Sequence, residues 1–107
     1  MSFKILPTPP FERELKKLSK RYPSIKSDLA ATILSLKETP TLGESLGNNC
    51  FKVRMAISSK NKGKSGGARV ITWLKIVDEI IFLISIYDKS DADTLSDKEL
   101  LIRVKDL

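Results

Sequence analysis

The segment from Ile80 to Tyr87 constrains the fold most, because it is apolar on both of the faces that a β-strand would have. Such a run is typical of a central strand that is covered on each side of its sheet. It is also much too short to cross a bilayer, so no membrane association is expected. With 107 residues and 41% apolar content, the chain can build one compact core. We therefore expect a single domain over residues 1–107.

Two amphipathic helices are expected ahead of the sheet segments. Residues 2–7 are predicted to be a short strand, and Thr8 is expected to cap a helix whose first turn holds two prolines. Pro23 ends this helix, and a second helix begins at Ser24 and ends before Pro40. The apolar positions at helical spacing are Phe11, Leu15, Leu18 and Tyr22 in the first helix, and Ile25, Leu29, Ile33 and Leu36 in the second.

The second half of the chain alternates between strands and connections. We expect a loop at 41–49, strands at 51–57, 68–76 and 80–87, a linker at 58–67 and a turn at 77–79. Ser96 and Glu99 have the spacing of a capping box, which predicts a last helix. The predicted order is β-α-α-β-β-β-α. It describes an α+β fold in which an N-terminal helical hairpin and a C-terminal helix pack a small antiparallel sheet.

The net positive charge comes from one quarter of the sequence. Between Phe51 and Val77 there are seven cations and no carboxylate, whereas the other 80 residues hold 12 basic and 13 acidic groups. Clustered like charge is self-repulsive, so a polyanionic partner is expected to offset it. The seven cations are Lys52, Arg54, Lys60, Lys62, Lys64, Arg69 and Lys75.

The chain has no histidine and one cysteine, which removes several kinds of chemistry. Triads built on histidine, zinc sites with histidine ligands and structural zinc sites with several cysteines are excluded. Cys50 cannot form an internal disulfide, which fits the reducing cytoplasm, and we expect it to be buried at a strand entrance. No metal or other cofactor is expected.

Three of the cations are predicted to converge on one face of the sheet. Lys52 and Arg54 are two residues apart on a strand, so they share a face, and Arg69 lies on the neighbouring strand. Such a group could clamp a phosphate, since arginine offers a planar, bidentate fork. The alternative is an ordinary solvated strand face without a site.

The lysines of the linker suggest contacts with a nucleic-acid backbone. A Gly-Lys-Ser sequence within it resembles a nucleotide-binding P-loop, but it leads into a strand and not into a helix. We expect the linker lysines to follow an RNA backbone, with a solvated charged loop as the alternative. The residues assigned to RNA or ribosome binding are Lys60, Lys62, Lys64 and Lys75.

The end of the apolar strand carries further polar groups. Tyr87 could stack on a base or relay a proton through its hydroxyl, or its ring could simply lie half in the core. Trp73 is predicted to be a packing residue. Acidic residues follow, and we interpret them as flanking the last helix; they are Asp88, Asp91, Asp93 and Asp97.

Two strings of residues resemble the RelE/ParE superfamily of bacterial toxins, and within it the RelE/HigB-like branch. They are Lys-Ser-Gly-Gly-Ala-Arg-Val-Ile at 64–71 and Ile-Ser-Ile-Tyr-Asp-Lys-Ser at 84–90. The likeness extends over the order of elements and the Tyr-Pro-Ser corner at 22–24. It implies an mRNA endonuclease that acts in the ribosomal A site, and an antitoxin that neutralises it. A toxin–antitoxin complex of this kind could bind its operator DNA through the antitoxin.

By motif, the resemblance places the family's basic strand residues on Lys52 and Arg54 and its next-strand arginine on Arg69. The cation after the last core strand falls on Lys89, and Tyr87 takes the place of a tyrosine that RelE carries nearer the final helix. The hypothesis is cleavage without a metal: Lys52 accepts the proton of a ribose 2′-OH, and the arginines stabilise the phosphorane. Lys89 or Tyr87 protonates the leaving oxygen, which yields a 2′,3′-cyclic phosphate.

Two alternatives remain open. A ParE-like toxin would poison DNA gyrase without cleaving RNA, although such chains lack the convergent cationic cluster. A catalytically inactive relative would bind RNA without cleaving it.

Overall fold

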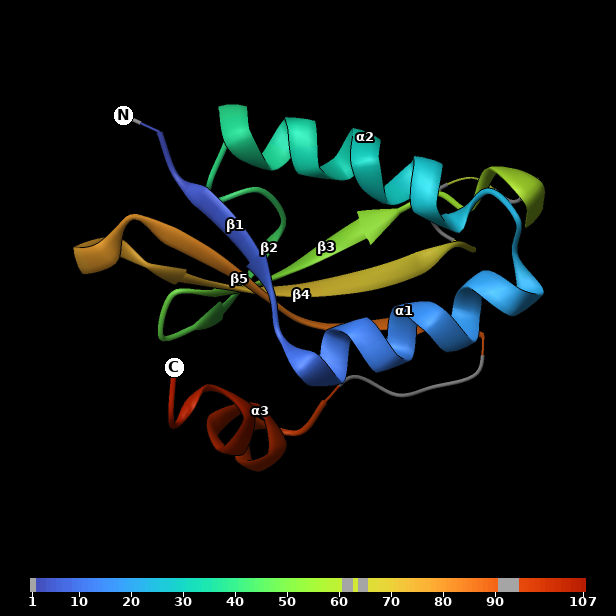
Figure 1. Cartoon of the computed structure of the whole chain (residues 1–107). Coiled ribbons are helices and arrows are strands. Elements are labelled where there is room, and N and C mark those ends of the chain that lie inside the picture. Colours follow the sequence, from blue (N-terminus) through green and yellow to red (C-terminus); the bar gives the residue numbers. More distant parts are fainter. Residues whose placement is uncertain (1, 61–62, 64–65, 91–94) are drawn as a thin grey trace.

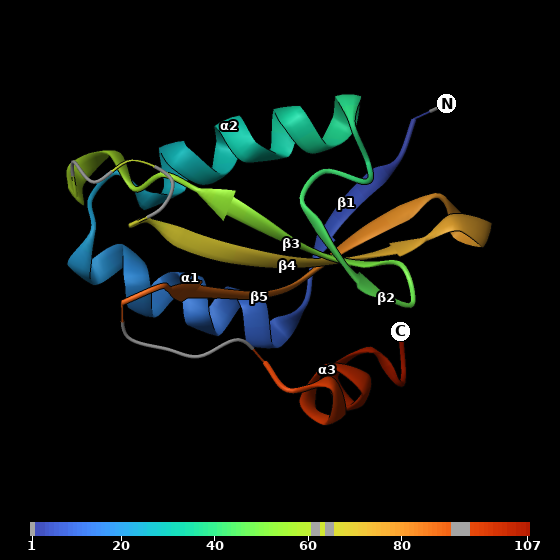
Figure 2. The same cartoon turned by 180° about the vertical axis from the view of Figure 1, so that it is seen from behind.

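The computed structural model describes residues 2–60, 63, 66–90 and 95–107. In this part of the chain, a five-stranded sheet in the order β1-β5-β4-β3-β2 carries three helices. Helices α1 and α2 cover one face of the sheet, and α3 lies on the other side (Figures 1 and 2). The described helices are too short or too polar for any of them to cross a membrane.

The N-terminal elements follow the predicted pattern. Strand β1 spans Lys4–Pro7, helix α1 spans Pro9–Arg21 and helix α2 spans Ile25–Glu38. Thr8 precedes α1 as expected, but its hydroxyl donates to the carbonyl of Leu83 at 2.9 Å and does not cap the helix. Thr8 therefore ties the start of α1 to Leu83 in strand β5.

One strand was not predicted. Strand β2 spans Glu44–Gly47, inside the expected loop, and pairs antiparallel with β3 at Cys50–Met55. The two strands are joined by Asn48 and Asn49, which both have positive φ angles, of 52° and 62°. Two-residue hairpin turns favour asparagine in this conformation, so the sequence feature read as a loop is the hairpin itself.

The three core strands lie as the sequence predicted. Strand β4 spans Ala68–Lys75 and pairs antiparallel with β3 and with β5 at Ile80–Asp88. Strand β5 is an interior strand, since its other neighbour is β1. That pair is parallel, so the sheet is mixed and not wholly antiparallel.

Apolar side chains pack on both faces of the sheet. Beneath α1 and α2, the buried side chains include Phe11, Leu18, Ile25, Leu29, Leu36, Val53, Val70, Ile81 and Ile86. A smaller cluster on the α3 side contains Cys50, Ile71, Ile84 and Leu100, and Trp73 stacks on Phe82 beside it. Cys50 and Trp73 thus have the packing roles that the sequence indicated.

Helix α3, at Asp97–Val104, starts at the predicted cap, where Ser96 accepts a hydrogen bond from the amide of Glu99 at 3.1 Å. Its Arg103 donates to both carboxylate oxygens of Glu14 in α1 and to the carbonyl of Ile84. Pairing between β1 and β5 ends at Leu83. Arg103 therefore satisfies a backbone group on the part of β5 that β1 does not reach.

Candidate functional site

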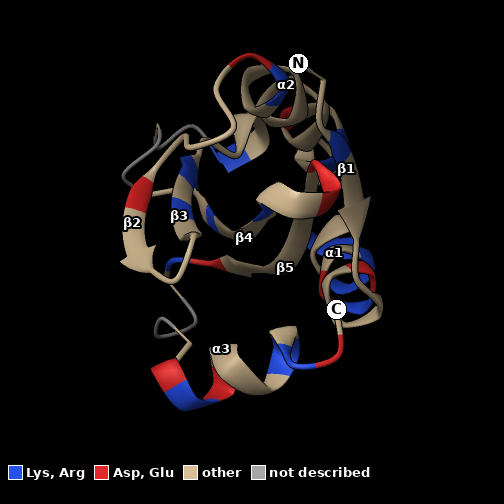
Figure 3. Cartoon of the chain, turned by 90° about the vertical axis from the view of Figure 1, so that its left-hand side faces the viewer, with Lys and Arg blue, Asp and Glu red and all other residues tan. Residues whose placement is uncertain are grey.

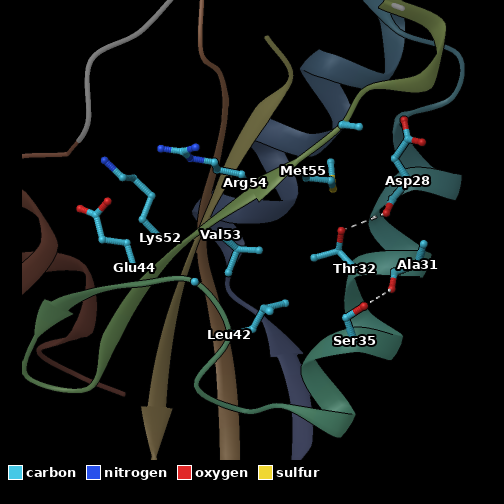
Figure 4. Close-up of a pocket in the computed structure, with 12 residues that line it drawn as sticks. Asp28, Ala31, Thr32, Ser35, Leu42, Glu44, Lys52, Val53, Arg54 and Met55 are labelled. Atoms are coloured by element: carbon cyan, nitrogen blue, oxygen red, sulfur yellow. Dashed lines mark hydrogen bonds between the residues drawn. The ribbon is translucent and has the colours of Figure 1, made fainter. Parts of the chain in front are cut away.

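The predicted cations of β3 project from one face of the sheet. Val53 and Met55 are buried beneath α2, and Lys52 and Arg54 alternate with them along the strand. Figure 4 shows the side chains of Lys52 and Arg54 extending away from α2. Figure 3 shows the basic positions on the neighbouring strands β3 and β4, above α3.

The strand register brings a row of three predicted site residues together. Arg54 lies directly opposite Arg69, and Arg69 lies directly opposite Tyr87 on β5. Side chains at directly opposed positions share a face, with Cβ atoms about 4.5–5.5 Å apart. Arg54, Arg69 and Tyr87 therefore cross three adjacent strands as one row. Lys52 lies two residues from Arg54 on the same face.

The two arginines of this row have different surroundings. Arg54 is exposed, whereas Arg69 is only 6% exposed and donates a hydrogen bond to the carbonyl of Ala68 at 3.1 Å. Burying a guanidinium is unfavourable unless it is paired or bound to an anion. The row thus presents one exposed cation beside one nearly buried cation.

The Gly-Gly-Ala-Arg sequence sets this register. A Cβ atom on Gly67 would lie 2.2 Å from the carbonyl oxygen of Met55, so the backbone of β3 passes too close for any side chain. Ala68 follows opposite Met55 and is fully buried. Arg69 is then the first β4 residue able to carry a large side chain on the open face.

Tyr87 lies near the end of β5, and Lys89 directly follows the strand. The ring of Tyr87 is partly buried against the smaller cluster. This agrees with the prediction that the ring lies half in the core. Lys89 is exposed, and its backbone amide donates to the carbonyl of Gly67 at 3.1 Å. This bond brings the backbone of Lys89 next to the segment that leads into Arg69.

Lys60 was expected to contact RNA from the surface, but its side chain points into the protein. Its ammonium nitrogen lies 2.6 Å from a carboxylate oxygen of Asp88, 3.0 Å from the carbonyl of Gly66 and 3.3 Å from the hydroxyl of Ser90. Lys60 is therefore engaged inside the protein. Lys62 and Lys64 lie outside the described residues.

Asp88 corrects a second expectation. The sequence indicates a helix-flanking residue, but the side chain of Asp88 is fully buried and forms an ion pair with Lys60. Burial would raise the pKa of Asp88, yet hydrogen bonds from Lys60, Tyr22 and Ser90 outweigh it and hold the pKa far below its usual range. The same bond to Asp88 raises the pKa of Lys60. Both groups are therefore charged at neutral pH.

Lys75 lies apart from the row. It is at the far end of β4, six residues after Arg69, which corresponds to about 20 Å along a strand. Its ammonium group pairs with Asp78 at 3.0 Å and with the carbonyl of Leu107 at 3.1 Å, above the ring of Trp73. Lys75 is thus not part of the convergent group.

Comparison with protein families decides the assignment of the chain. The family described as the RelE toxin of the RelE/RelB toxin–antitoxin system matches residues 4–105. The chain belongs to the RelE toxin family.

Solved structures of a RelE toxin share the fold of this RelE-family chain. A variant of E. coli RelE in the free state matches it with a TM-score of 0.64 and 20% identity, over 100% of this chain and 99% of that one. The isolated E. coli RelE toxin matches with a TM-score of 0.60 and 17% identity, over 99% of this chain and 100% of that one. The predicted RelE-like fold is confirmed. Among curated protein sequences, none matches this chain significantly.

Membership of the RelE family makes this chain a toxin of a toxin–antitoxin system, for which a cognate antitoxin is the implied partner. The sequence analysis missed one charged residue near the row of this RelE chain. Glu44 lies opposite Lys52 in the β2–β3 pair, and their side chains lie close together in Figure 4. The signal was the asparagine turn, because a hairpin at that position would have placed Glu44 beside Lys52.

Proposed function

We propose that this RelE-family toxin is an endoribonuclease that cleaves mRNA in the ribosomal A site and thereby inhibits translation. The observation that carries the proposal is the cross-strand row of Arg54, Arg69 and Tyr87, with Lys52 beside it on the same face. Three cations from two adjacent strands can surround one phosphodiester, and arginine binds a phosphate in a bidentate manner.

The reaction would proceed by attack of a ribose 2′-OH on the neighbouring phosphate. Lys52, in its neutral form, would accept the hydroxyl proton, and the 2′ oxygen would form a bond to phosphorus as the 5′ oxygen leaves. Tyr87 or Lys89 would donate a proton to that leaving oxygen. The products are a 2′,3′-cyclic phosphate and a 5′-hydroxyl, and no step uses a metal ion.

The arginines would supply the electrostatic part of catalysis. Charge builds up on the non-bridging oxygens in the phosphorane, and donors that are already in place stabilise it most. Arg69 suits this role because it is nearly buried, where a charge–charge interaction is weakened less by water. Arg54, directly opposite it, would bind the same phosphate from the solvent side.

We further propose that the ribosome orients the mRNA for this site. A lysine is a weak general base at neutral pH, because most of its molecules are already protonated. Efficient cleavage therefore depends on a substrate held in the reactive geometry. Free RNA should be cleaved slowly. The reaction would take place in the cytoplasm, a cognate antitoxin would block it, and the toxin–antitoxin complex would bind its operator DNA through the antitoxin.

Primer extension on mRNA from cells that briefly express the protein tests this function. We expect breaks at codon boundaries that disappear when translation is blocked. Arg69→Ala should abolish the breaks and the growth arrest, while Arg13→Ala, an exposed arginine on α1, should change neither. An Arg69→Ala protein that stays fully toxic would exclude the proposed site. Intact mRNA together with inhibited supercoiling by the purified protein would instead favour a gyrase poison, and ribosome binding without cleavage an inactive relative.

A further inference from the structure

A buried polar network lies directly behind the predicted site. Its centre is Asp88, whose side chain is 0% exposed and which accepts hydrogen bonds from Lys60, from the hydroxyl of Tyr22 and from both the amide and the hydroxyl of Ser90. Tyr87 precedes Asp88 on β5, so the two side chains point to opposite faces of the sheet. The network therefore sits on the side away from the row of Arg54, Arg69 and Tyr87.

Lys60 has no ammonium proton left for an external phosphate. A lysine ammonium has three donors, and three acceptors surround this one: Asp88, the carbonyl of Gly66 and the hydroxyl of Ser90. The side chain of Lys60 is only 13% exposed. Its position suits an internal cation and does not suit a contact with an RNA backbone.

The network joins three parts of the chain that are far apart in sequence. Tyr22 lies at the corner between α1 and α2, Lys60 in the connection after β3 and Asp88 at the end of β5. The turn that carries Lys60, at Ser58–Lys60, is itself bonded to α2 and to Ser24, the residue before that helix. There the amide of Ser58 donates to Asp28, and the amide of Ser59 donates to the hydroxyl of Ser24, each at 2.9 Å.

These bonds hold the two strand ends that carry the site. Asp88 pairs with Ala68, the residue before Arg69, and lies between Tyr87 and Lys89. Gly66, which Lys60 binds through its carbonyl, leads into the same strand. Any shift at Asp88 or Gly66 would move Arg69 relative to Tyr87.

We propose that Lys60, Asp88 and Tyr22 form a positioning clamp that holds the ends of β4 and β5 so that Arg69 and Tyr87 meet the same phosphate. This proposal rests on the proposed nuclease function. The clamp residues touch no substrate and act through the backbone of the site residues. A charged pair suits this task because it fixes one arrangement, whereas an apolar contact would tolerate sliding.

The test compares Lys60→Met, Asp88→Asn and Tyr22→Phe with the unaltered protein in cleavage of mRNA on programmed ribosomes. Rates are normalised to the folded fraction measured by circular dichroism. We expect kcat to fall at least about tenfold for Lys60→Met and Asp88→Asn, since a misplacement of about 1 Å can cost 10²-fold. KM and the dependence of ribosome affinity on salt should not change. Tyr22→Phe removes a single hydroxyl and should show a smaller loss of kcat, which keeps the test open if a charge variant fails to fold.

Two control variants separate positioning from other roles. Leu36→Ala removes a fully buried side chain of α2 and should lower stability without lowering kcat per folded molecule. Lys17→Met removes an exposed lysine of α1 and should leave every readout unchanged. If Lys60→Met instead weakens binding and reduces the salt slope by about one, Lys60 contacts a phosphate and the clamp is wrong.

The outcomes also separate the clamp from the proposed function. An unaltered protein that does not cleave ribosome-bound mRNA overturns the nuclease, and the clamp with it. An active protein whose clamp variants keep their kcat overturns the clamp alone.

Discussion

At the scale of single residues, the proposed site contains two arginines that lie directly opposite each other although their charges repel. Like charges directly opposite each other destabilise a pair of strands. Arg54 and Arg69 occupy such positions on β3 and β4. In the proposed nuclease, a phosphate bound between the two groups would offset this repulsion. If they bind a phosphate as proposed, the exposed Arg54 and the nearly buried Arg69 would contact it from different depths of the surface.

The shape of the Arg69 head group should matter as much as its charge. Arg69→Lys keeps the charge but loses the planar fork that binds two phosphate oxygens. We expect the cleavage rate on ribosomes to fall by about 10²-fold or more, as for loss of one preorganised donor, with little change in the unfolding midpoint. Single-turnover kinetics at saturating ribosome concentration measures this. Arg13→Lys, on α1, is the matched control, and unchanged cleavage by Arg69→Lys would contradict a bidentate role.

Gly67 should tolerate no side chain. Because its Cβ would overlap the carbonyl oxygen of Met55, Gly67→Ala must push β4 away from β3. We expect the free energy of unfolding to fall by about 1–3 kcal/mol, and the displaced Arg69 to lose cleavage as well. Urea denaturation measures the loss of stability, and the cleavage assay on ribosomes measures the loss of activity. Gly47→Ala is a useful comparison, since nothing lies within 4 Å of the added atom, although its φ of 86° adds some strain.

At the scale of elements, sequence patterns predicted most of the helices and strands. They missed the hairpin strand β2 and the pairing of strands that are distant in sequence. The apolar run of β5, the proline-bounded helices and the Ser96 cap depend on nearby residues, so they could be recognised directly. Strand β2 was missed because glycine and asparagine signal both loops and hairpin turns. The parallel pairing of β1 with β5 joins residues 76 positions apart, which no local pattern encodes.

Helix α3 should depend on one side chain for its docking. Arg103 joins α3 to Glu14 at 3.1 Å and to the carbonyl of Ile84 at 3.0 Å. Arg103→Met leaves both acceptors without this donor, and we expect a loss of about 1–3 kcal/mol in the free energy of unfolding. Amide hydrogen exchange in Asp97–Val104 should accelerate more than in β4. Lys98→Met, at an exposed site on the same helix, should leave amide exchange nearly unchanged. If α3 is equally protected in Arg103→Met and Lys98→Met, apolar packing alone holds the helix.

At the scale of the whole molecule, basic residues that are alike in sequence have different tasks. Arg54 is exposed on the open face of the sheet, Lys60 is enclosed behind it, and Lys75 is paired at the far end. The convergence of Lys52, Arg54 and Arg69 could be predicted, because alternation along a strand fixes the face of each residue. The internal position of Lys60 could not be predicted, since its partner Asp88 is 28 residues away. In the sequence, Asp88 has the pattern of a helix-flanking carboxylate.

The Lys60–Asp88 pair should stabilise the molecule evenly over the neutral range. The pKa of Asp88 is below its ordinary 3.8, so its contribution is complete above that pH and is lost as the pH falls further. The pKa of Lys60 is above its ordinary 10.5, so its contribution is complete below that pH and is lost as the pH rises through the raised value. Asp88→Asn should therefore cost about 3 kcal/mol at every pH from about 5 to 9, with a smaller difference below about pH 4. Urea unfolding of both proteins across this range measures it, and a difference that shrinks between pH 5 and 9 would be inconsistent with a charged pair.

The most direct measurement is the analysis of RNA ends after purified protein is mixed with ribosomes that hold a defined mRNA codon in the A site. We expect one cut in that codon, with a 2′,3′-cyclic phosphate on the upstream fragment and a 5′-hydroxyl on the downstream fragment. Protein that was treated with EDTA should stay fully active on ribosomes that keep their magnesium. Arg69→Ala should give no cut. Cleavage that leaves other ends, or a cut that persists undiminished in Arg69→Ala, would contradict a reaction centred on these side chains.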